Sequence, residues 1–187
     1  MAELILFHHA QGLTKGVRAF ADLLRAGGHE VTVPDMYEGA TFATLEEGVA
    51  HAERTGYEAI IARGMAAATG LPAGIVCAGF SLGALPAQKL AQTRPGVLGA
   101  ILYHGGVAAT WFGGPWPANV ALQLHMTEHD PWCERDVAQN LVSQAADGEL
   151  FIYPGSAHLV TDSSLGGYDP AIAAAILART LAFLKRF

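Results

Sequence analysis

The sequence predicts an α/β fold, with helices on both faces of one mainly parallel sheet. Short apolar runs alternate along the chain with longer helical patterns, and this alternation favours parallel strands joined by right-handed crossovers. The composition agrees, because 51% of the residues are hydrophobic and only 15% are charged, as expected when helices bury both faces of a sheet. At 187 residues, the chain is long enough for a single domain with a sizeable core.

Six strands are predicted from short apolar runs that end at glycine, proline or another turn-forming residue. The expected strands are residues 4–8, 30–33, 73–78, 97–103, 119–126 and 150–153. The helical patterns between them place apolar residues on one face. The expected helices cover residues 14–26, 44–68 in two pieces, and 84–92. A last helix is expected to have Asp169 as its N-cap and Pro170 as its first residue.

The segment Gly79-Phe80-Ser81-Leu82-Gly83 lies between the third predicted strand and the helix that follows it. A Gly-x-Ser-x-Gly sequence in this context is typical of a nucleophile elbow, a turn so tight that its serine adopts a strained backbone conformation. Such a turn would lift the Ser81 hydroxyl above the strand end and leave the Leu82 amide free to donate to an oxyanion. The alternative is a glycine-rich loop, since the chain has 22 glycines.

Candidate partners for Ser81 follow in the chain order serine, acid, histidine that such sites use. Asp130 follows the fifth predicted strand, and His158 follows the sixth. Because the carboxyl ends of parallel strands meet at one edge of a sheet, we expect these three side chains to lie together there. A serine needs an imidazole to accept its proton, and the imidazole needs a carboxylate to orient it. Glu128 is the second candidate for the acid.

Charge and composition limit the kinds of binding partner and the cellular compartment that the sequence predicts. The net charge of −6 without a basic cluster argues against binding to nucleic acid or to an anionic membrane surface. No apolar stretch is long enough for a membrane span, and the first apolar run, residues 4–7, is too short for a signal peptide. Cys77 and Cys133 do not suggest a disulfide framework, so we expect a cytoplasmic protein with reduced thiols. The oligomeric state, a homodimer included, is left open.

Neither a cofactor nor a metal is expected. The chain has no glycine-rich phosphate-binding loop of a known type, which argues against a nucleotide cofactor. His125 and His129 have the spacing of two metal ligands on a helix, but they lie across a strand end and a turn, where that spacing does not align them.

Taken together, these motifs resemble those of the dienelactone hydrolase family, within the α/β-hydrolase superfamily. The resemblance covers nearly the whole chain, and the segments that carry it are residues 6–12, 20–31, 34–37, 79–83, 128–131 and 155–158. It implies a minimal α/β-hydrolase fold with a six-stranded sheet of order 2-1-3-4-5-6, counted along the chain. It also implies an oxyanion hole formed by the amides of Leu82 and of Ala10, which lies in the loop after the first strand.

Three departures from the family pattern concern the substrate. The founding activity of the family uses a cysteine at the elbow and a glutamate in the first loop, where this chain has Ser81 and His9. Members that act on dienelactone also carry an arginine shortly after the histidine to hold a substrate carboxylate. Here His158 is followed within four residues by Asp162 and by no cation. An anionic ring lactone is therefore not the expected substrate.

The candidate pocket residues are His9, Gln11, Trp111, Trp116 and Trp132. His9 and Gln11 follow the first strand at the site-facing edge, although His9 could equally bond to the loop backbone. Trp111 and Trp116 lie in a glycine- and proline-rich loop, about residues 104–118, whose position after the fourth strand is common for a lid in this superfamily. The alternative for these aromatic residues is the packing of a surface loop.

The sequence therefore predicts a cofactor-independent hydrolase of small neutral carboxylic esters or lactones that works through an acyl-enzyme at Ser81. Two enzymatic alternatives stay open. One is a dienelactone hydrolase that acts on an anionic lactone, and the other is acyl transfer or perhydrolysis at the same serine. A non-catalytic receptor for small ligands is a weaker alternative, because binding alone does not require an acid and a base in register with a serine.

Overall fold

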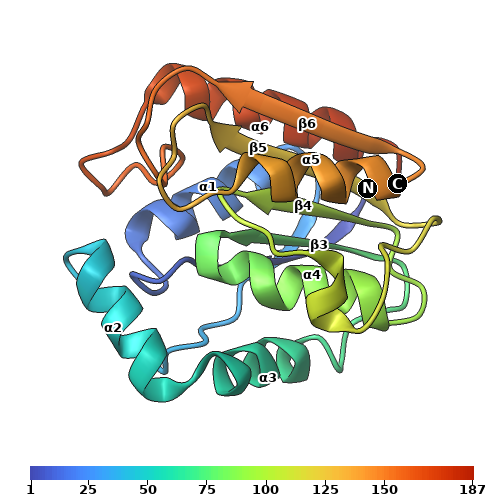
Figure 1. The fold of residues 1–187 in the computed structure, drawn as a ribbon, viewed down its shortest axis with the longest axis horizontal. Helices are drawn as coiled ribbons and strands as arrows, with labels where there is room; N and C mark the ends of the chain where they lie inside the picture. Colours follow the sequence, from blue (N-terminus) through green and yellow to red (C-terminus); the bar gives the residue numbers. More distant parts are fainter.

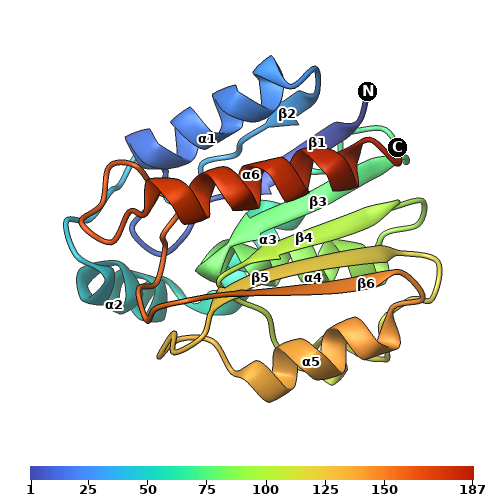
Figure 2. The same ribbon diagram turned by 90° about the horizontal axis from the view of Figure 1, so that it is seen from above.

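The computed structural model describes all 187 residues, and one six-stranded sheet forms its centre (Figure 2). Every strand pair is parallel, and the order β2-β1-β3-β4-β5-β6 confirms the predicted fold class. The strands are β1 (Glu3–Phe7), β2 (Glu30–Thr32), β3 (Ile75–Phe80), β4 (Gly99–Tyr103), β5 (Ala121–Thr127) and β6 (Gly148–Tyr153). The α-helices are α1 (Lys15–Ala26), α2 (Leu45–Thr55), α3 (Tyr57–Ala67), α4 (Ala84–Thr93), α5 (Arg135–Gln144) and α6 (Pro170–Leu184). Two short 3₁₀ helices are η1 (Ser81–Gly83) and η2 (Ala109–Phe112).

Helices cover both faces of the sheet (Figures 1 and 2). Helices α1 and α6 pack on one face over a core of 19 buried residues that includes Phe20 and Phe183. Helices α3, α4 and α5 pack on the other face over a core of 26 buried residues that includes Ile60, Leu90 and Leu141. A sheet buried on both faces accounts for the high hydrophobic and low charged content of the chain.

All the strands run in the same direction, so their carboxyl ends share one edge of the sheet, the side on which α2 lies (Figure 1). The strands end at nearly the same level, because Phe7 of β1 pairs with Gly79 of β3, and Phe80 of β3 pairs with Tyr103 of β4. The loops that follow these strands therefore converge at a single place. This edge is where open parallel sheets bind ligands.

Side-chain caps define where several helices begin. The Thr14 hydroxyl accepts a hydrogen bond from the Val17 amide at the start of α1. At α2, Thr44 and Glu47 form a reciprocal capping box. Asp169 caps α6 directly before Pro170, as predicted. No helix is both long enough and apolar enough to span a membrane.

The two helical pieces predicted within residues 44–68 are α2 and α3, and Gly56 separates them with a φ of +87° that favours glycine. Pro86 lies within the first turn of α4, where helix amides lack intrahelical partners, so it does not break the helix. Gly64 of α3 lies against it, and a Cβ there would come within 2.6 Å of the Pro86 Cβ. This glycine lets the two helices pack closely.

The observed strands differ from the predicted ranges by one or two residues at one or both ends. At the start of β6 the difference has a cause that hydropathy does not report. Strand β6 begins at Gly148, two residues before the predicted start, because Gly148 pairs with Leu122 of β5 and the Leu122 amide donates to the Asp147 carbonyl. Backbone pairing extends the strand beyond the apolar run that identified it. The result moves no residue of the site.

Gly83 provides a test of the contact between the elbow and β1. A Cβ at this position would come within 2.5 Å of the Phe7 carbonyl oxygen and 2.6 Å of the His8 carbonyl oxygen. Backbone cannot yield as a flexible side chain does, so Gly83→Ala should lower the free energy of unfolding by about 2–3 kcal/mol. Urea denaturation measures this change. Gly70→Ala, where an added Cβ meets nothing within 4 Å, is the matched control, and equal losses in both variants would contradict the prediction.

Candidate active site

Ser81 lies in a sharp turn between β3 and α4. Its φ of +50° is a left-handed conformation that is uncommon for a residue with a Cβ. Two glycines make the turn sterically feasible. A Cβ at Gly79 would lie 2.0 Å from the Gly83 carbonyl oxygen, and a Cβ at Gly105 would lie 2.8 Å from the Ser81 carbonyl oxygen. This is the strand–turn–helix geometry that the Gly-x-Ser-x-Gly segment predicted.

Asp130 lies in the turn after β5, and its surroundings fix both of its carboxylate oxygens. The Trp132 amide donates to Oδ1 at 2.9 Å, while Oδ2 lies 2.7 Å from Nδ1 of His158. The turn is tied to the loop after β6, because the hydroxyl of Thr127 donates to the Ala157 carbonyl at 3.0 Å. These contacts hold the acid and the histidine loop in one arrangement.

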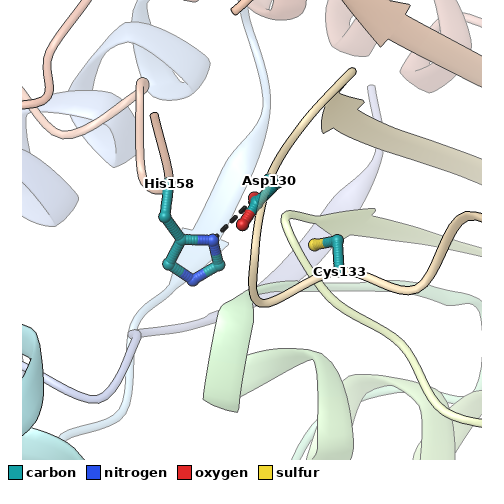
Figure 3. Close-up of side chains that lie close together, drawn as sticks. All are labelled: Asp130, Cys133 and His158. Atoms are coloured by element: carbon teal, nitrogen blue, oxygen red, sulfur yellow. Dashed lines mark hydrogen bonds and ion pairs between the residues drawn. The ribbon is translucent and has the colours of Figure 1, made fainter. Parts of the chain in front are cut away.

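His158 connects the serine to the acid. Its Nε2 lies 2.8 Å from Ser81 Oγ. Its Nδ1 lies 2.7 Å from Asp130 Oδ2, the hydrogen bond drawn as a dashed line in Figure 3. With Nδ1–H donating to the carboxylate, Nε2 is left to accept the serine proton. Burial opposes ionisation of Asp130, but the hydrogen bonds from His158 and from the Trp132 amide outweigh burial and lower the pKa of Asp130 below its usual range. The acid is therefore ionised at neutral pH. Glu128, the second candidate, has a 48% exposed side chain and makes no contact with this histidine.

Cys133 lies beside this pair (Figure 3), and its sulfur is within 4.8 Å of the nearest ligand atoms of Asp130 and His158. Three such groups could in principle hold a metal ion. Burial and the neighbouring Asp130 charge raise the pKa of the Cys133 thiol well above its usual range, so the thiol is protonated beside the hydrogen-bonded His158–Asp130 pair. Cys77 is a fully buried residue of β3, and burial raises the pKa of its thiol to about 12.

The amides of Ala10 and Leu82, the expected oxyanion donors, belong to residues that line the same cavity as Ser81. Leu82 follows Ser81 at the start of the elbow helix. The Ala10 amide donates to no acceptor within the protein, whereas its carbonyl is held against α2. A Cβ at Gly48 would lie 2.2 Å from that carbonyl oxygen. The carbonyl of Ala10 is thus held against α2, while its N–H, in the preceding peptide group, has no acceptor within the protein.

Two cavities adjoin the serine and the histidine. The first, of about 190 Å³, is lined by Ser81 together with mainly apolar side chains, namely Val49, Ala52, Tyr57, Leu82, Leu85, Val107 and Trp132. The second, of about 260 Å³, is lined by His158 together with Gln11, Thr44, Leu45, Leu159 and Leu165. No arginine, lysine, aspartate or glutamate lines either of them. A substrate that spans both would meet Ser81 and His158 at their boundary.

The structure brings only part of the expected pocket together. Trp132 lines the first cavity with its ring centroid 6.2 Å from that of His158, and Gln11 lines the second. Trp116 is instead a core residue that is 3% exposed, and its indole N–H donates to the Val120 carbonyl. Trp111 is 69% exposed and lines neither cavity. The expectation that these two tryptophans line the pocket is therefore corrected, since one turns inward to the core and the other outward to solvent.

The loop at about residues 104–118, expected to be lid-like, is fastened to α4 by two glutamine side chains. The Gln88 amide bonds to both the N–H and the carbonyl of Val107, and Gln92 donates to the carbonyl of Ala109. The start of the loop lines the first cavity, because Gly105, Gly106 and Val107 form part of its wall. The rest of the loop packs against the helix.

His9 is 1% exposed and lines neither cavity, which corrects its placement in the pocket. Its Nε2 lies 2.8 Å from Oδ2 of Asp162, and its Nδ1 accepts a hydrogen bond from the Gln11 amide. Asp162 is also buried, and burial opposes its ionisation. Hydrogen bonds from His9, Ser164 and Thr14 outweigh that penalty and lower the pKa of Asp162 to about 2. The loop-bonded role for His9, left open by the sequence, is the one observed.

Sequence reasoning did not single out His104, which directly follows β4 with a φ of +53° and lines the first cavity. Its ring lies edge-on to that of His158, with centroids 5.9 Å apart. Burial, reinforced by the His158 charge, lowers the pKa of His104 to about 3, so the ring is neutral at neutral pH. Its position directly after an apolar strand could have identified His104 as a candidate site residue. Val49 and Tyr57, which also line the first cavity from α2 and α3, have no feature in the sequence that would identify them.

A serine elbow at the carboxyl edge of a parallel sheet of this order defines the chain as an α/β hydrolase. The model of the dienelactone hydrolase family matches residues 2–187. The chain therefore belongs to the dienelactone hydrolase family.

Solved structures with the same fold include several hydrolases. A dienelactone hydrolase-like promiscuous phosphotriesterase from metagenomic libraries aligns with a TM-score of 0.75 at 17% identity, over 100% of this chain and 86% of its own. A dienelactone hydrolase from Anabaena variabilis has a TM-score of 0.70 at 16% identity, over 100% and 87%. A structure of the metagenome-derived lipolytic enzymes LipS and LipT has a TM-score of 0.66 at 14% identity, over 100% and 94%. Among curated proteins, none matches the chain. The family and these neighbours identify a hydrolytic enzyme.

Asp162 yields a prediction for the pH dependence of stability. Its folded-state pKa of about 2 lies below the unfolded value of about 3.9, so its contribution is complete only above about pH 5 and is lost progressively as the pH falls through the folded pKa. The difference corresponds to roughly 2–3 kcal/mol. Urea denaturation between pH 2 and 6 should therefore show a shallower loss of stability in Asp162→Asn than in the wild type. Ser164→Ala keeps the carboxylate and should retain most of the wild-type slope; parallel curves for wild type and Asp162→Asn would contradict the assignment.

Proposed function

We propose that this chain is a serine hydrolase that cleaves small neutral carboxylic esters or lactones through an acyl-enzyme at Ser81. The observation that carries the proposal is the unbroken hydrogen-bonded chain from Ser81 through His158 to Asp130, at the boundary of two uncharged cavities. A nucleophile, a base and an orienting acid within hydrogen-bond reach are the parts that acyl transfer requires.

In the proposed reaction, Ser81 Oγ attacks the substrate carbonyl carbon while its proton passes to His158 Nε2. The Ala10 and Leu82 amides donate to the oxyanion that develops on the carbonyl oxygen. His158 then returns the proton to the leaving oxygen, and the acyl group stays on Ser81. A water molecule deprotonated by His158 attacks the acyl-enzyme and releases the acid. Asp130 holds the Nδ1–H tautomer and stabilises the imidazolium formed in both halves.

The two cavities suggest how the substrate lies. The acyl group stays attached to Ser81 beside the oxyanion donors, so it belongs in the first cavity, which Ala10 and Leu82 also line. The leaving group receives its proton from His158, which lines the second cavity. A volume of about 190 Å³ is below the roughly 300–1,000 Å³ typical of ligand pockets. Short or compact acyl groups therefore fit better than long chains.

Neutral substrates are favoured because neither cavity supplies a partner for a carboxylate. No arginine or lysine lines them, and His104 is neutral. Arg63, which sequence alone could not place, donates to the Met36 carbonyl instead. Placing an unpaired carboxylate in an apolar pocket costs several kcal/mol.

Substitution of the triad tests the mechanism. Ser81→Ala and His158→Ala should each lower kcat by about 10⁴- to 10⁶-fold on a short p-nitrophenyl ester, because the nucleophile or the base is lost. Asp130→Asn should lower kcat by about 10⁴-fold, because the required histidine tautomer is no longer held. All three variants should stay folded by circular dichroism. His129→Ala, at a 72% exposed side chain next to Asp130 in sequence, is the matched control and should stay within about twofold of the wild type. A serine-directed fluorophosphonate that labels a residue other than Ser81 would refute this mechanism.

Substrate charge gives a second test. The dimethyl ester of a short dicarboxylic acid should be hydrolysed with a kcat/KM at least about tenfold higher than its monomethyl ester, since tenfold corresponds to only about 1.4 kcal/mol of the desolvation cost. Initial rates at fixed ionic strength measure the ratio. Leu85→Lys would add an ammonium to the wall of the first cavity and should narrow the preference. A wild-type preference for the monoester would count against a neutral substrate.

A further inference from the structure

Outside the triad, the molecule holds one other buried carboxylate–imidazole pair, His9 and Asp162. Their side chains are 1% and 2% exposed, and His9 Nε2 lies 2.8 Å from Asp162 Oδ2. The same Oδ2 accepts a hydrogen bond from the Thr14 hydroxyl at 2.5 Å, and Oδ1 accepts from the Ser164 amide at 2.8 Å and from the Ser164 hydroxyl at 2.6 Å. No step of the proposed reaction uses this cluster.

The cluster has no hydrogen-bonding capacity left for a substrate. A carboxylate has about four acceptor positions, and Asp162 uses four. Both ring nitrogens of His9 are also occupied, because Nδ1 accepts from the Gln11 amide while Nε2–H donates to Asp162. This pattern fixes the tautomer of a neutral imidazole. His9 can therefore neither bind substrate nor exchange a proton with it while these bonds persist.

The pair connects the two loops that the reaction must keep in register. His9 directly precedes Ala10, whose amide is an expected oxyanion donor, and Asp162 lies four residues after His158 in the loop that carries the proposed base. The Asp162 amide donates to the carbonyl of Leu159, which has a φ of +57°, so the histidine loop closes on itself through Asp162. A displacement of either loop would strain the His9–Asp162 bond.

The start of α1 is built around the same carboxylate. Thr14 donates to Asp162 while capping the helix, and the Gly16 amide donates to the Ser164 hydroxyl at 3.2 Å. Gly16 lies so close to Asp162 that an added Cβ would overlap its carboxylate. A charge buried with directional donors from three segments specifies their geometry in a way that apolar contacts, which can slide, do not.

We propose that the His9–Asp162 bridge is a positioning device for catalysis: it holds the Ala10 amide at the place where the oxyanion forms relative to Ser81 and His158. The proposal rests on the proposed function, because it assigns the bridge a role in that reaction. Oxyanion donors act at about 2.7–3.1 Å from the developing charge. A small shift of Ala10 therefore weakens transition-state binding more than substrate binding, and the bridge affects kcat rather than KM.

A pair of His9 variants separates the bridge from the local loop contact. Asn at position 9 can place an oxygen near the Nδ1 position and keep the Gln11 contact, but it does not reach Asp162. Gln at position 9 can place an N–H near the Nε2 position and keep the Asp162 bond. With p-nitrophenyl acetate, His9→Asn should lower kcat about 10- to 100-fold with KM changed less than about threefold, and His9→Gln should stay within about threefold of wild type. The inhibition constant of a short trifluoromethyl ketone, which forms an oxyanion at the serine, should rise in His9→Asn by the factor that kcat falls.

Ser164→Ala is the matched control. It removes one hydrogen bond to Asp162 and the Gly16 contact but leaves the bridge, so it should lower Tm while keeping kcat within about twofold. The proposal is overturned if His9→Asn keeps the wild-type kcat, or if the kcat of His9→Gln is as low as that of His9→Asn. It is also overturned if Ser164→Ala, with the same Tm as His9→Asn, loses as much kcat as His9→Asn does. Should His9→Asn not fold, Asp162→Asn is judged by the same kcat and inhibitor criteria. The proposed function is tested separately: it is overturned if Ser81→Ala keeps the wild-type rate. If hydrolysis depends on Ser81 but is unaffected by the bridge variants, the positioning proposal fails and the proposed function stands.

Discussion

The close approach of backbone to backbone around Ser81 is the constraint on which the rest of the site depends. The elbow passes so near to β1 that Gly83 has no room for a Cβ against the Phe7 and His8 carbonyls, and Gly79 has none against Gly83. The same compression gives Ser81 its positive φ. Because β1 is held this close, the loop that follows it can bring the Ala10 amide to the cavity that Ser81 lines. The proposed nucleophile and one proposed oxyanion donor are thus positioned by the same steric contact.

Two buried carboxylates keep the other side of the site in place. Asp130 and Asp162 each sit in the loop region beyond a strand and each accept a hydrogen bond from a histidine. Hydrogen-bond donors stabilise the ionised form of both acids and lower both pKa values despite burial. The two pairs differ in whether the histidine has a ring nitrogen free to contact another group. His158 has one nitrogen directed at Ser81, whereas His9 has none to spare. The two similar pairs therefore fit the different tasks proposed for them, proton transfer for His158 and Asp130 and positioning for His9 and Asp162.

Much of the fold and of the serine–histidine–aspartate site was predictable because it depends on local sequence patterns. The strand–helix alternation, the cap of α6 and the elbow depend on residues within a few positions of one another, and the strand order followed from the family resemblance. The His9–Asp162 bond joins residues 153 positions apart and has no periodic signature. Trp116 was misplaced because an aromatic residue in a glycine- and proline-rich loop has the same sequence pattern whether it turns toward the core or the pocket. Its inward turn depends on acceptors such as the Val120 carbonyl, which only the folded chain brings near.

The departures from the family pattern also acquire a common explanation. The resemblance implies a glutamate at the position of His9 and an arginine shortly after His158, whereas this chain has His9 and, within four residues of His158, Asp162 and no cation. In the structure His9 and Asp162 contact each other. An arginine in the second loop could meet a substrate carboxylate, whereas Asp162 is buried and fully bonded. In this chain the two loops are thus linked through His9 and Asp162. With Ser81 in place of a cysteine, no resting thiolate needs a neighbouring acid to control it. The three departures are therefore consistent with the proposed action of a serine on a neutral substrate.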